Sequence, residues 1–512
     1  MIGTLDRALG RITMYRLVWM TLAALLLIAL GYSAAGLIFF TPLEILATAV
    51  VAVVSTTGVT WLIATAVRSP AHLESSLVTG LLIAFLLFPS AEPRALLVVA
   101  LVGAVAAASK YVLAWRGRHL FNPAAVAVLL IALAQGLLEG TALDGSLTAA
   151  AWVLPTGALW PWVLVASLLI VARVRRWSIF LVFVLVASAV SVGQSVLVNG
   201  QDAGAALMSV LTAYPFVFAG AFMLTEPLTL APRRSQQIVV AVVAALLTSV
   251  PFHLGLLYSS PELGLVVGNA IAFAFAYRQR RRLSLELRSS SEIAPGITEY
   301  RFRPRVPVPF EAGQWLELDL PHRADSRGSR RTFSIASAPA DGEIAIATRS
   351  PEKPSSFKRA LAGLEPGASV RATSVGGDFV LPADPSTPLL LVAGGIGITP
   401  FASQLRAIAD GQERDVVVVY AAARIEDVAY RELLRESGAR VVLVSRETPS
   451  SLPEGWTHVP GRLSAEKLAD AVPDAPRRTG LVSGSPSFVD SVRGALRAAG
   501  AKSVRTDAFA GY

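Results

Sequence analysis

Cysteine is missing from the 512-residue sequence, and histidine occurs only 5 times. The absence of thiols excludes disulfides, thiolate nucleophiles and cysteine-ligated iron–sulfur clusters. Haem between helices needs histidine pairs at matching depth, and the apolar half of the chain offers only His72, His119 and His253, which make no such pair. We therefore predict no metal site, and any electrons carried by this chain must travel on organic cofactors.

Charged residues are scarce, at 16% of the sequence, and they are unevenly spread. Between Val18 and Tyr277, apolar runs of roughly 20 residues recur between short polar breaks, whereas charges appear every few residues from Arg278 onward. The first run, Val18–Phe40, is too long for a signal-peptide core and is interpreted as an uncleaved span. The pattern predicts a multi-pass membrane domain over residues 1–277 and soluble domains after it.

The apolar runs predict ten spans, at residues 18–40, 43–66, 73–88, 95–114, 121–138, 151–172, 177–198, 205–224, 236–257 and 262–277. Arginines gather in the loops of one side and in both flanks, while the other side carries only Arg94. Because cationic loops mark the cytoplasmic side, we expect a protein of the cell membrane with both termini in the cytoplasm. Topology then accounts for the net charge of +9, and no nucleic-acid partner is predicted.

Three segments interrupt the apolar runs with glycine, proline or polar groups: Leu77–Pro89, His119–Pro123 and Phe222–Pro227. Backbone broken at membrane depth persists only where it is buried in protein or lines a cavity. A plainer interpretation stays open, since Asn122-Pro123 is a typical helix start and Glu226-Pro227 a typical helix stop.

Taken together over residues 20–277, the three segments resemble the membrane-subunit family that contains the D subunit of Rnf electron-transport complexes and the B subunit of sodium-pumping NADH:quinone reductase. The resemblance implies two inverted five-helix repeats and a flavin among the helices, close to Asn122 and Thr225. Many members attach FMN to the last threonine of a Ser/Thr-Gly-Ala-Thr segment, where this chain has Thr156-Gly157-Ala158-Leu159. Leu159 has no hydroxyl, so the membrane flavin is predicted either to be noncovalent FMN or riboflavin or to be absent.

The soluble half begins with short alternating strands such as Gln314–Leu320 and Glu343–Thr348, which favour a small antiparallel β-barrel over residues 278–385. Within it, Arg331-Thr-Phe333-Ser334 offers a guanidinium for a pyrophosphate, an aromatic ring and a hydroxyl. Ser355 and Ser356 precede a short helical stretch, and Gly377 and Phe379 follow a strand. An ordinary amphipathic strand would also fit the first segment.

A strand, glycine turn and helix follow from residue 386, over Leu389–Ala393, the turn Gly394-Gly395-Ile-Gly397-Ile-Thr399-Pro400, and a helix with Phe401, Leu405 and Ile408 on one face. Glycines allow close approach of a pyrophosphate, and the helix N-terminus attracts it. Further along come Ser483-Gly484-Ser-Pro486 and the terminal residues Asp507, Phe509 and Tyr512.

These segments, in this order, resemble the ferredoxin–NADP reductase superfamily. The resemblance implies FAD in the barrel, NADPH or NADH in an α/β parallel-sheet domain over residues 386–512, and Ser334, Ser483 and Asp507 near the reacting rings. Two departures are Pro354, where the family has glycine, and Ser483, where it has cysteine. Hydride transfer needs no thiol, since the flavin performs the chemistry.

We therefore predict an α-helical membrane bundle followed by an FAD barrel and an NAD(P) domain, passing electrons from NAD(P)H to a quinone or an extracytoplasmic flavoprotein. Arg424 and Arg446, just beyond two strands, slightly favour NADPH, because guanidinium groups suit a 2′-phosphate. A transporter or channel with a redox-sensing flavin module remains the alternative, although few ionisable residues lie in the spans.

Overall fold

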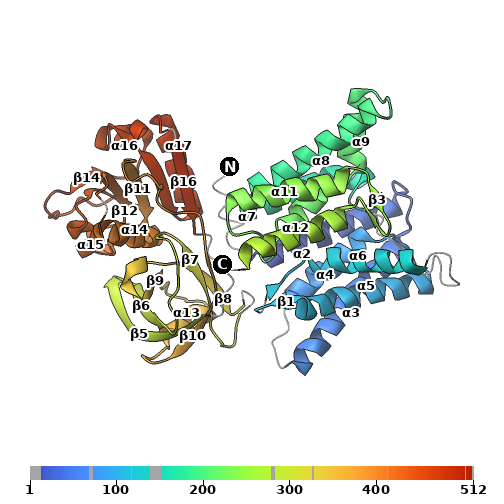
Figure 1. Cartoon of the computed structure of the whole chain (residues 1–512), viewed down its shortest axis with the longest axis horizontal. Coiled ribbons are helices and arrows are strands. Elements are labelled where there is room, and N and C mark those ends of the chain that lie inside the picture. Colours follow the sequence, from blue (N-terminus) through green and yellow to red (C-terminus); the bar gives the residue numbers. More distant parts are fainter. Residues whose placement is uncertain are drawn as a thin grey trace. The chain divides into compact units, whose positions relative to one another are not determined.

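A computed structural model describes residues 13–67, 73–116, 118–138, 152–277, 283–325, 328–411, 413–501 and 503–509. They fall into two compact units, a helical unit that ends at Tyr277 and a C-terminal unit described from Leu283 onward (Figure 1). Each unit is presented by itself.

The helical unit is built from α-helices joined by short turns. Its helices are α2 (Met14–Ala34), α3 (Pro42–Ala66), α4 (Leu73–Leu86), α5 (Pro93–Val112), α6 (Pro123–Leu138), α7 (Trp160–Val174), α8 (Trp177–Leu197), α9 (Ala203–Ala213), α10 (Phe216–Phe218), α11 (Arg234–Ser249) and α12 (Pro261–Ala276). A short 3-10 helix, η1 (Gly157–Leu159), precedes α7, and a π-helix, η2 (Ala219–Leu224), continues α10. Two small hairpins, β1 (Ala114–Trp115) with β2 (Arg118–His119) and β3 (His253–Leu254) with β4 (Leu257–Tyr258), connect neighbouring helices.

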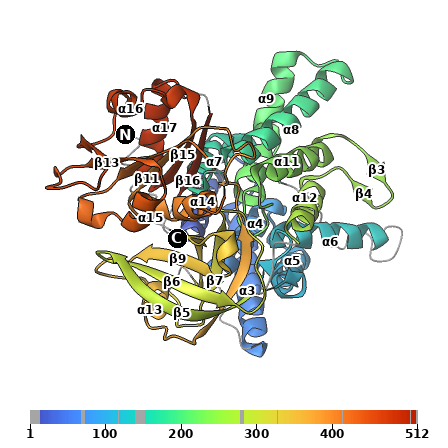
Figure 2. The ribbon, with the colours of Figure 1, turned by 60° about the vertical axis from the view of Figure 1, so that its left-hand side comes forward.

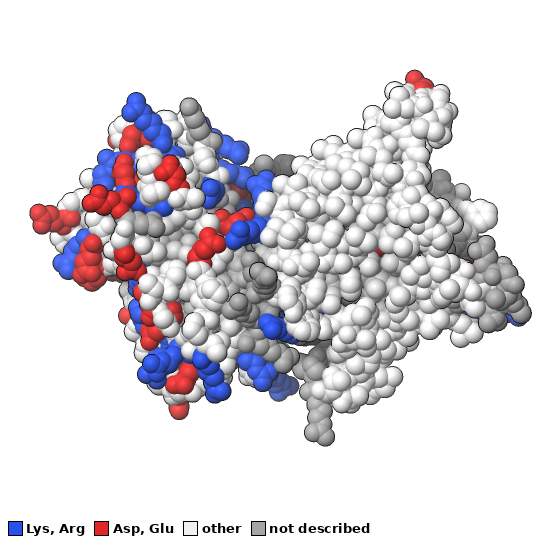
Figure 3. Space-filling view, in the orientation of Figure 1, with Lys and Arg blue, Asp and Glu red and all other residues white. Residues whose placement is uncertain are grey.

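Five helical segments are long and apolar enough to cross a membrane: Met14–Ala34, Pro42–Ala66, Pro93–Val112, Gly157–Val174 and Trp177–Leu197. A sixth is added if Ala203–Ala213 and Phe216–Leu224, bent by 51°, form one broken span. Each of the ten predicted segments overlaps a helix, but α4, α6, α11 and α12 are shorter, so the number of spans stays a prediction. On the face in Figure 3 the helical unit shows almost no charged side chains, whereas they cover much of the C-terminal unit.

Small residues let the helices of this unit approach closely. A Cβ atom at Gly80 would lie 2.7 Å from the Val53 Cα, and one at Gly264 would lie 2.5 Å from the Ala244 carbonyl oxygen. Such close backbone approach is typical of helix packing in membranes, where small residues take the place of a hydrophobic driving force.

The C-terminal unit begins with a six-stranded antiparallel sheet in the order β8-β7-β10-β5-β6-β9. The strands are β5 (Leu283–Ala294), β6 (Ile297–Pro304), β7 (Trp315–Asp319), β8 (Arg330–Ser334), β9 (Ile344–Arg349) and β10 (Ser369–Gly376), and the helix α13 (Ser356–Ala362) lies between β9 and β10 in the chain. Among the described residues no ladder joins the edge strands β8 and β9, although the Ala336 N–H donates to the Ala345 carbonyl at 2.8 Å. The structure therefore shows a six-stranded antiparallel sheet, and the barrel expected from the sequence is not confirmed.

The second sheet is parallel, in the order β14-β13-β12-β11-β15-β16. Its strands are β11 (Leu389–Gly394), β12 (Val416–Ala421), β13 (Arg440–Ser445), β14 (Thr457–Pro460), β15 (Thr479–Gly484) and β16 (Ser503–Ala508), with helices α14 (Thr399–Ala409), α15 (Arg431–Glu436), α16 (Ala465–Ala471) and α17 (Pro486–Ala498). Alternate residues of β11 belong to two separate cores, Leu389 and Leu391 with Phe401 of α14, and Leu390 and Val392 with Val489 of α17. Helices therefore cover both faces, and α17 runs along β15 and β16 (Figure 2).

The strand order reverses at β11, because the chain builds outward from β11 to β14 and then returns to place β15 on the other side. In open parallel sheets, ligands bind outside the carboxyl ends of the strands at such a switch point. The carboxyl ends of β11 and β15 are therefore where a nucleotide is expected.

Buried contacts hold the two sheets together within the C-terminal unit. Glu299 of β6 is 3% exposed, and its carboxylate pairs with Arg301 at 2.8 Å and with Arg406 of α14 at 3.9 Å. Phe379, which follows β10, packs on Phe401 with ring centroids 5.6 Å apart. Residues of the antiparallel sheet are thereby fixed relative to the parallel one.

Candidate functional site

The glycine turn after β11 is shaped by contacts that only glycine permits. Gly395 has a φ of +53°, and a Cβ at Gly397 would lie 2.3 Å from the Ser483 carbonyl oxygen. A Cβ at Gly394 would lie 2.7 Å from the Phe488 ring. The turn, η4 (Gly395–Ile398), leads straight into α14 at Thr399-Pro400, so the N-terminal end of that helix lies at the turn.

Ser483 and Asp507, which are 24 residues apart in sequence, lie side by side at the carboxyl ends of β15 and β16. Their register pairs Ser483 with Asp507 and Gly484 with Ala508, and the Phe509 N–H donates to the Gly484 carbonyl at 2.9 Å. The Ser483 hydroxyl is buried and has no hydrogen-bond partner among the described residues. An orphaned buried hydroxyl in a crevice between strand ends fits a site for a polar ligand group.

The remaining predicted residues of this edge are Gly484, Pro486 and Tyr512. Gly484 has a φ of +155°, and Pro486 begins α17 behind the N-cap Ser485. Tyr512 lies outside the described residues.

The pKa of Asp507 is changed by its surroundings at this edge of the sheet. Burial, together with the nearby carboxylate of Asp378, raises the pKa of Asp507 from 3.8 to about 6. Asp378 follows β10 of the antiparallel sheet, so acidic groups from the two sheets are close enough to repel each other. At neutral pH the folded protein bears the repulsion between them.

A pH-dependent stability follows from the raised pKa of Asp507. Between about pH 4 and pH 6 the folded state holds a proton that the unfolded state releases, so stability falls as the pH rises through this window. We expect Asp507→Asn to raise the melting temperature at pH 7 and to match the wild type near pH 4. Thermal unfolding measured from pH 4 to 8 checks this, with Asp470→Asn, an exposed position on α16, as the control.

Arg331, Phe333, Ser355 and Ser356 come together at the other predicted cofactor segment. The Arg331 guanidinium lies 5.3 Å from the centre of the Phe357 ring, and the Phe333 ring lies 5.8 Å from it. Ser355 caps α13 by accepting the Lys358 N–H at 3.3 Å. Strand β8 and helix α13 thus place one cation, two rings and a helix start together.

The carboxylate of Asp325 lies between these groups. It accepts the Ser356 N–H at 3.2 Å and pairs with Arg331 at 3.5 Å, while the Asp325 N–H donates to the Ser356 hydroxyl at 2.9 Å. A guanidinium and a backbone N–H that share one anionic group are the partners a pyrophosphate needs. The Asp325 carboxylate is an anionic group held by Arg331 and the Ser356 N–H. Its contacts indicate that these two groups fit a dinucleotide diphosphate.

Three further residues predicted to bind the flavin, Ser334, Gly377 and Phe379, lie against other residues of the C-terminal unit. Ser334 ends β8 opposite Trp315. Gly377 has a φ of +114°, and a Cβ there would lie 2.9 Å from the Trp315 ring, so glycine is required. Phe379 is 5% exposed and packs on Phe401, which gives its ring a role in joining the two sheets.

Arg424 and Arg446 follow β12 and β13, and both are exposed. Arg424 contacts Asp427 at 3.5 Å, three residues on. Both positions lie at the carboxyl ends of the parallel strands, and β12 and β13 lie on the same side of β11.

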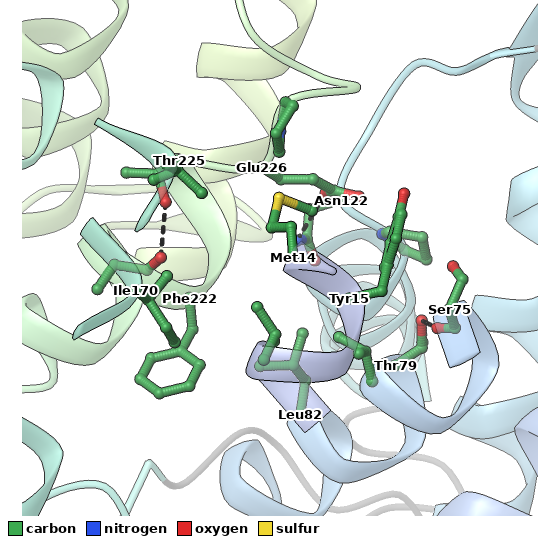
Figure 4. A pocket seen from close by; sticks show the side chains of 16 residues that line it. Met14, Tyr15, Ser75, Thr79, Leu82, Asn122, Ile170, Phe222, Thr225 and Glu226 are labelled. Carbon is green, nitrogen blue, oxygen red and sulfur yellow. Dashed lines mark hydrogen bonds between the residues drawn. The ribbon is translucent and has the colours of Figure 1, made fainter. Parts of the chain in front are cut away.

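A pocket in the helical unit gathers the two residues predicted there (Figure 4). The space inside it that a water-sized sphere can enter is about 40 Å³. It is lined by Met14, Tyr15, Val18, Ser75, Val78, Thr79, Leu82, Asn122, Pro123, Ile170, Val174, Ala221, Phe222, Thr225, Glu226 and Pro227. The first turns of α2, α4 and α6 meet at this pocket, and the π-helix η2 ends there.

Sequence patterns missed three members of these sites. In the sequence, His119 and Glu226 belong to two of the segments that carry the membrane-subunit resemblance and have no role of their own there, yet their side chains meet at 2.8 Å beside the pocket. Asp325 lies in a loop with no motif. The available signal was the carboxylate of Glu226 within an apolar stretch, since ionisable residues in such stretches are usually functional. Among the described residues, no group of three or more His, Cys, Asp or Glu side chains could hold a metal.

Comparison with known proteins places the C-terminal unit. The family described as oxidoreductase NAD-binding domain matches residues 391–494. The chain is 34% identical over 189 residues to ferredoxin–NADP reductase B of Sorangium cellulosum, covering 35% of this chain and 71% of that protein. It is 33% identical over 172 residues to an NADPH oxidoreductase of Mycobacterium tuberculosis, covering 32% and 43%, and 27% identical over 205 residues to a flavohemoprotein of Bacillus subtilis, covering 38% and 51%. The chain spans about half the length of the latter two relatives.

Proposed function

The chain belongs to the ferredoxin–NADP reductase family, and on that premise we propose that it is a membrane-bound enzyme passing electrons from cytoplasmic NAD(P)H through FAD to an acceptor in or across the membrane. The family membership makes it an NAD(P)H-dependent flavin oxidoreductase that binds FAD. The membrane part of the proposal is carried by one observation. The same chain holds a reductase unit and at least five helical segments apolar and long enough to span a bilayer.

FAD supplies the chemistry, since it accepts a hydride and can release electrons singly. The chain's residues hold and orient it. Arg331 and the Ser356 N–H would bind the pyrophosphate after their contacts with the Asp325 carboxylate break. The Phe333 and Phe357 rings offer apolar surface beside it. The nicotinamide nucleotide would bind at the glycine turn, with its diphosphate near the start of α14. The Ser483 hydroxyl is then available to a polar group of the nicotinamide.

The helical unit is proposed to take electrons from FAD on a second, noncovalent flavin in the pocket bordered by Asn122 and Thr225. The first turns of three helices at this pocket favour an anionic group such as the FMN phosphate. From there electrons would reach a quinone or an extracytoplasmic flavoprotein. Both termini are proposed to be cytoplasmic, in line with the arginine distribution.

Flavin analysis of the purified full-length protein tests this function. We expect solvent extraction to release FAD together with FMN or riboflavin, at more than one flavin per chain. We expect no fluorescent band on a denaturing gel, because Leu159 lacks the hydroxyl needed for a phosphoester. A yield of one FAD per chain and nothing else would contradict the proposed second flavin, and a fluorescent band would contradict its noncovalent binding.

We expect NADPH to be preferred over NADH. Arg424 and Arg446 follow adjacent strands, and a guanidinium pairs well with the 2′-phosphate of NADPH. Replacing both by alanine should raise the KM for NADPH at least tenfold, since each charged hydrogen bond contributes about 1.5–3 kcal/mol, and should leave the KM for NADH unchanged. Steady-state rates with both nucleotides provide the measurement, and a wild-type preference for NADH would overturn the assignment.

A further inference from the structure

One face of the helix α14 is hydrogen-bonded to the antiparallel sheet. The Ser403 hydroxyl donates to the Ser337 carbonyl at 2.7 Å, and a guanidinium N–H of Arg406 donates to the Ala336 carbonyl. Ser403 and Arg406 are three residues apart, so their side chains lie on the same side of the helix. The two acceptors are neighbours in the chain and follow the end of β8 directly, beside the segment that contains Arg331.

A third contact joins α14 to the other segment predicted to bind the flavin. Gln404 Nε2 donates to the Phe379 carbonyl at 2.8 Å, and the Gln404 side chain is fully buried. A Cβ at Gly313 would lie 2.4 Å from Gln404 Nε2 and 2.2 Å from the Phe379 carbonyl oxygen, so glycine leaves room for this bond. The helix is therefore bonded both to the segment after β8 and to the segment after β10.

The segment that accepts the bonds of Ser403 and Arg406 is itself fixed. The Ala336 N–H donates to the Ala345 carbonyl at 2.8 Å. The Ser337 hydroxyl donates to the Glu343 carbonyl at 2.8 Å and accepts the Ala345 N–H at 3.0 Å. Because these bonds lie within the antiparallel sheet, loss of the α14 contacts would release the helix and leave the accepting segment in place.

The Arg406 guanidinium is held from both sheets. It lies 3.9 Å from the buried carboxylate of Glu299 on β6, which also pairs with Arg301 at 2.8 Å. On the other side it lies 5.3 Å from the centre of the Tyr430 ring, which precedes α15 of the parallel sheet. One side chain thus contacts a carbonyl and a carboxylate of the antiparallel sheet and a ring that belongs to the parallel one.

These contacts lie close to the glycine turn along the helix. Ser403 is four residues after Thr399, the first residue of α14, which corresponds to about 6 Å along the helix axis. The turn Gly395–Ile398 continues into the helix without a break. Since an α-helix moves as a rigid rod over such a length, the three contacts determine where the turn lies relative to the antiparallel sheet.

We propose that Ser403, Gln404 and Arg406 are positioning residues that set the distance between the nicotinamide and the flavin. This role rests on the placement of FAD and of the nucleotide given under the proposed function. Hydride transfer requires the reacting atoms to be about 3–3.5 Å apart, and a misplacement of about 1 Å can slow a reaction on the order of 100-fold. The three side chains act through the backbone of α14 and its glycine turn.

Apolar packing alone would fix this distance less well. The Phe379 and Phe401 rings already join α14 to the antiparallel sheet, with their centroids 5.6 Å apart. Contacts between rings are favourable over a range of offsets, whereas hydrogen bonds weaken steeply when their angles change. The hydrogen bonds of α14 therefore determine its lateral position, and the rings contribute mainly to stability.

A distance measurement on the full-length protein tests the proposal without any cofactor. Because the chain has no cysteine, Ser290→Cys and Asp470→Cys, at exposed positions on β5 and α16, allow two spin labels with no background labelling. We expect one narrow distance distribution by pulsed electron paramagnetic resonance. The added double substitution Ser403→Ala and Arg406→Lys should shift or broaden it. Lysine keeps the charge but lacks the fork of nitrogens with which Arg406 contacts Ala336 and Glu299.

Stopped-flow reduction by saturating NADPH under anaerobic conditions supplies the second measurement. In the double variant, without the labelling cysteines, we expect reduction of each bound FAD to slow by about 10-fold to 100-fold. Its FAD content and its KM for NADPH should stay within about twofold of the wild type, because the residues that bind the cofactors are unchanged. A merely structural role would lower the melting temperature and leave the rate per bound FAD unchanged. Ser403→Ala alone should be intermediate, and it decides the question if the double variant does not fold.

Arg478→Lys is the matched control. Arg478 is a buried arginine that also contacts a carboxylate and a backbone carbonyl, those of Asp415 at 2.7 Å and Leu389 at 3.2 Å. It lies at the amino ends of the parallel strands, away from the glycine turn. Arg478→Lys should lower the melting temperature and keep both the wild-type distance and the wild-type rate.

The outcomes separate this inference from the proposed function. A wild-type protein that contains no FAD, or whose FAD is not reduced by NADPH, would overturn the proposed function and this inference with it. Normal reduction in the wild type, together with a wild-type distance or a wild-type rate in the double variant, would overturn this inference alone.

Discussion

Replacing Gly397 by alanine is expected to abolish reduction of FAD by NAD(P)H. The added Cβ would lie 2.3 Å from the Ser483 carbonyl oxygen, 2.6 Å from its carbon and 2.7 Å from the Gly484 Cα. These are backbone atoms of β15, so relief requires the strand end to move away from the glycine turn. Overpacking of this kind typically costs about 1–3 kcal/mol, and here it also distorts the edge where the nucleotide would bind. Single-turnover FAD reduction provides the measurement.

Gly494→Ala is the matched control for that variant. Gly494 lies within α17, and no atom lies within 4 Å of a Cβ built there. Alanine should stabilise the helix by about 0.5–1 kcal/mol and leave the reduction rate unchanged. Full activity in Gly397→Ala would mean that the close approach of the turn to β15 is not needed for nucleotide binding.

Arg331→Ala is expected to release FAD from the purified protein. Its guanidinium is the cation beside the Ser356 N–H, and a hydrogen bond to a charged group contributes about 1.5–3 kcal/mol. That corresponds to a loss of affinity of roughly 10- to 150-fold, measurable by flavin content and by FAD titration of the apoprotein. Arg330→Ala removes the neighbouring cation, which pairs with Asp319 instead, and should retain FAD.

Asp325→Asn should have the opposite effect. An asparagine keeps the side-chain shape but removes the negative charge that competes with a pyrophosphate for Arg331 and the Ser356 N–H. FAD should therefore bind more tightly than in the wild type. Equal FAD affinity in the wild type, Arg331→Ala and Asp325→Asn would refute the placement of the pyrophosphate at this cluster.

Local patterns were enough to predict the elements of the parallel sheet. The apolar run Leu389–Ala393, the glycine turn and the spacing of Phe401, Leu405 and Ile408 are set by neighbours in sequence, and all three helix residues are buried as expected. The family membership, the flavin and the nicotinamide nucleotide are confirmed by the relatives. The resemblance of the helical unit to membrane subunits stays a prediction.

Long-range partners could not be predicted from patterns. Asp325 and Ser356 are 31 residues apart, and His119 and Glu226 are 107 residues apart. The sequence around one member of each pair therefore does not indicate which residue it contacts. Closure of the antiparallel sheet likewise depends on how β8 and β9 meet, which strand alternation does not specify. The adjacency of Ser483 and Asp507 could be expected only through the superfamily resemblance, because register between parallel strands is fixed by the packed sheet.

The place of β11 in its sheet also governs when this enzyme can become functional during its synthesis. One neighbour, β12, is made soon after β11, but Leu389 pairs on the other side with Thr479, which is 90 residues later. Until β15 has left the ribosome, one edge of β11 has no strand paired to it. The glycine turn after β11 also lacks its contact with the Ser483 backbone. Parallel pairing over such a separation is slow and leaves apolar strands open to aggregation. We therefore expect nascent chains that stop before β15 to need chaperones, and nucleotide binding to appear only after the sheet closes around β11.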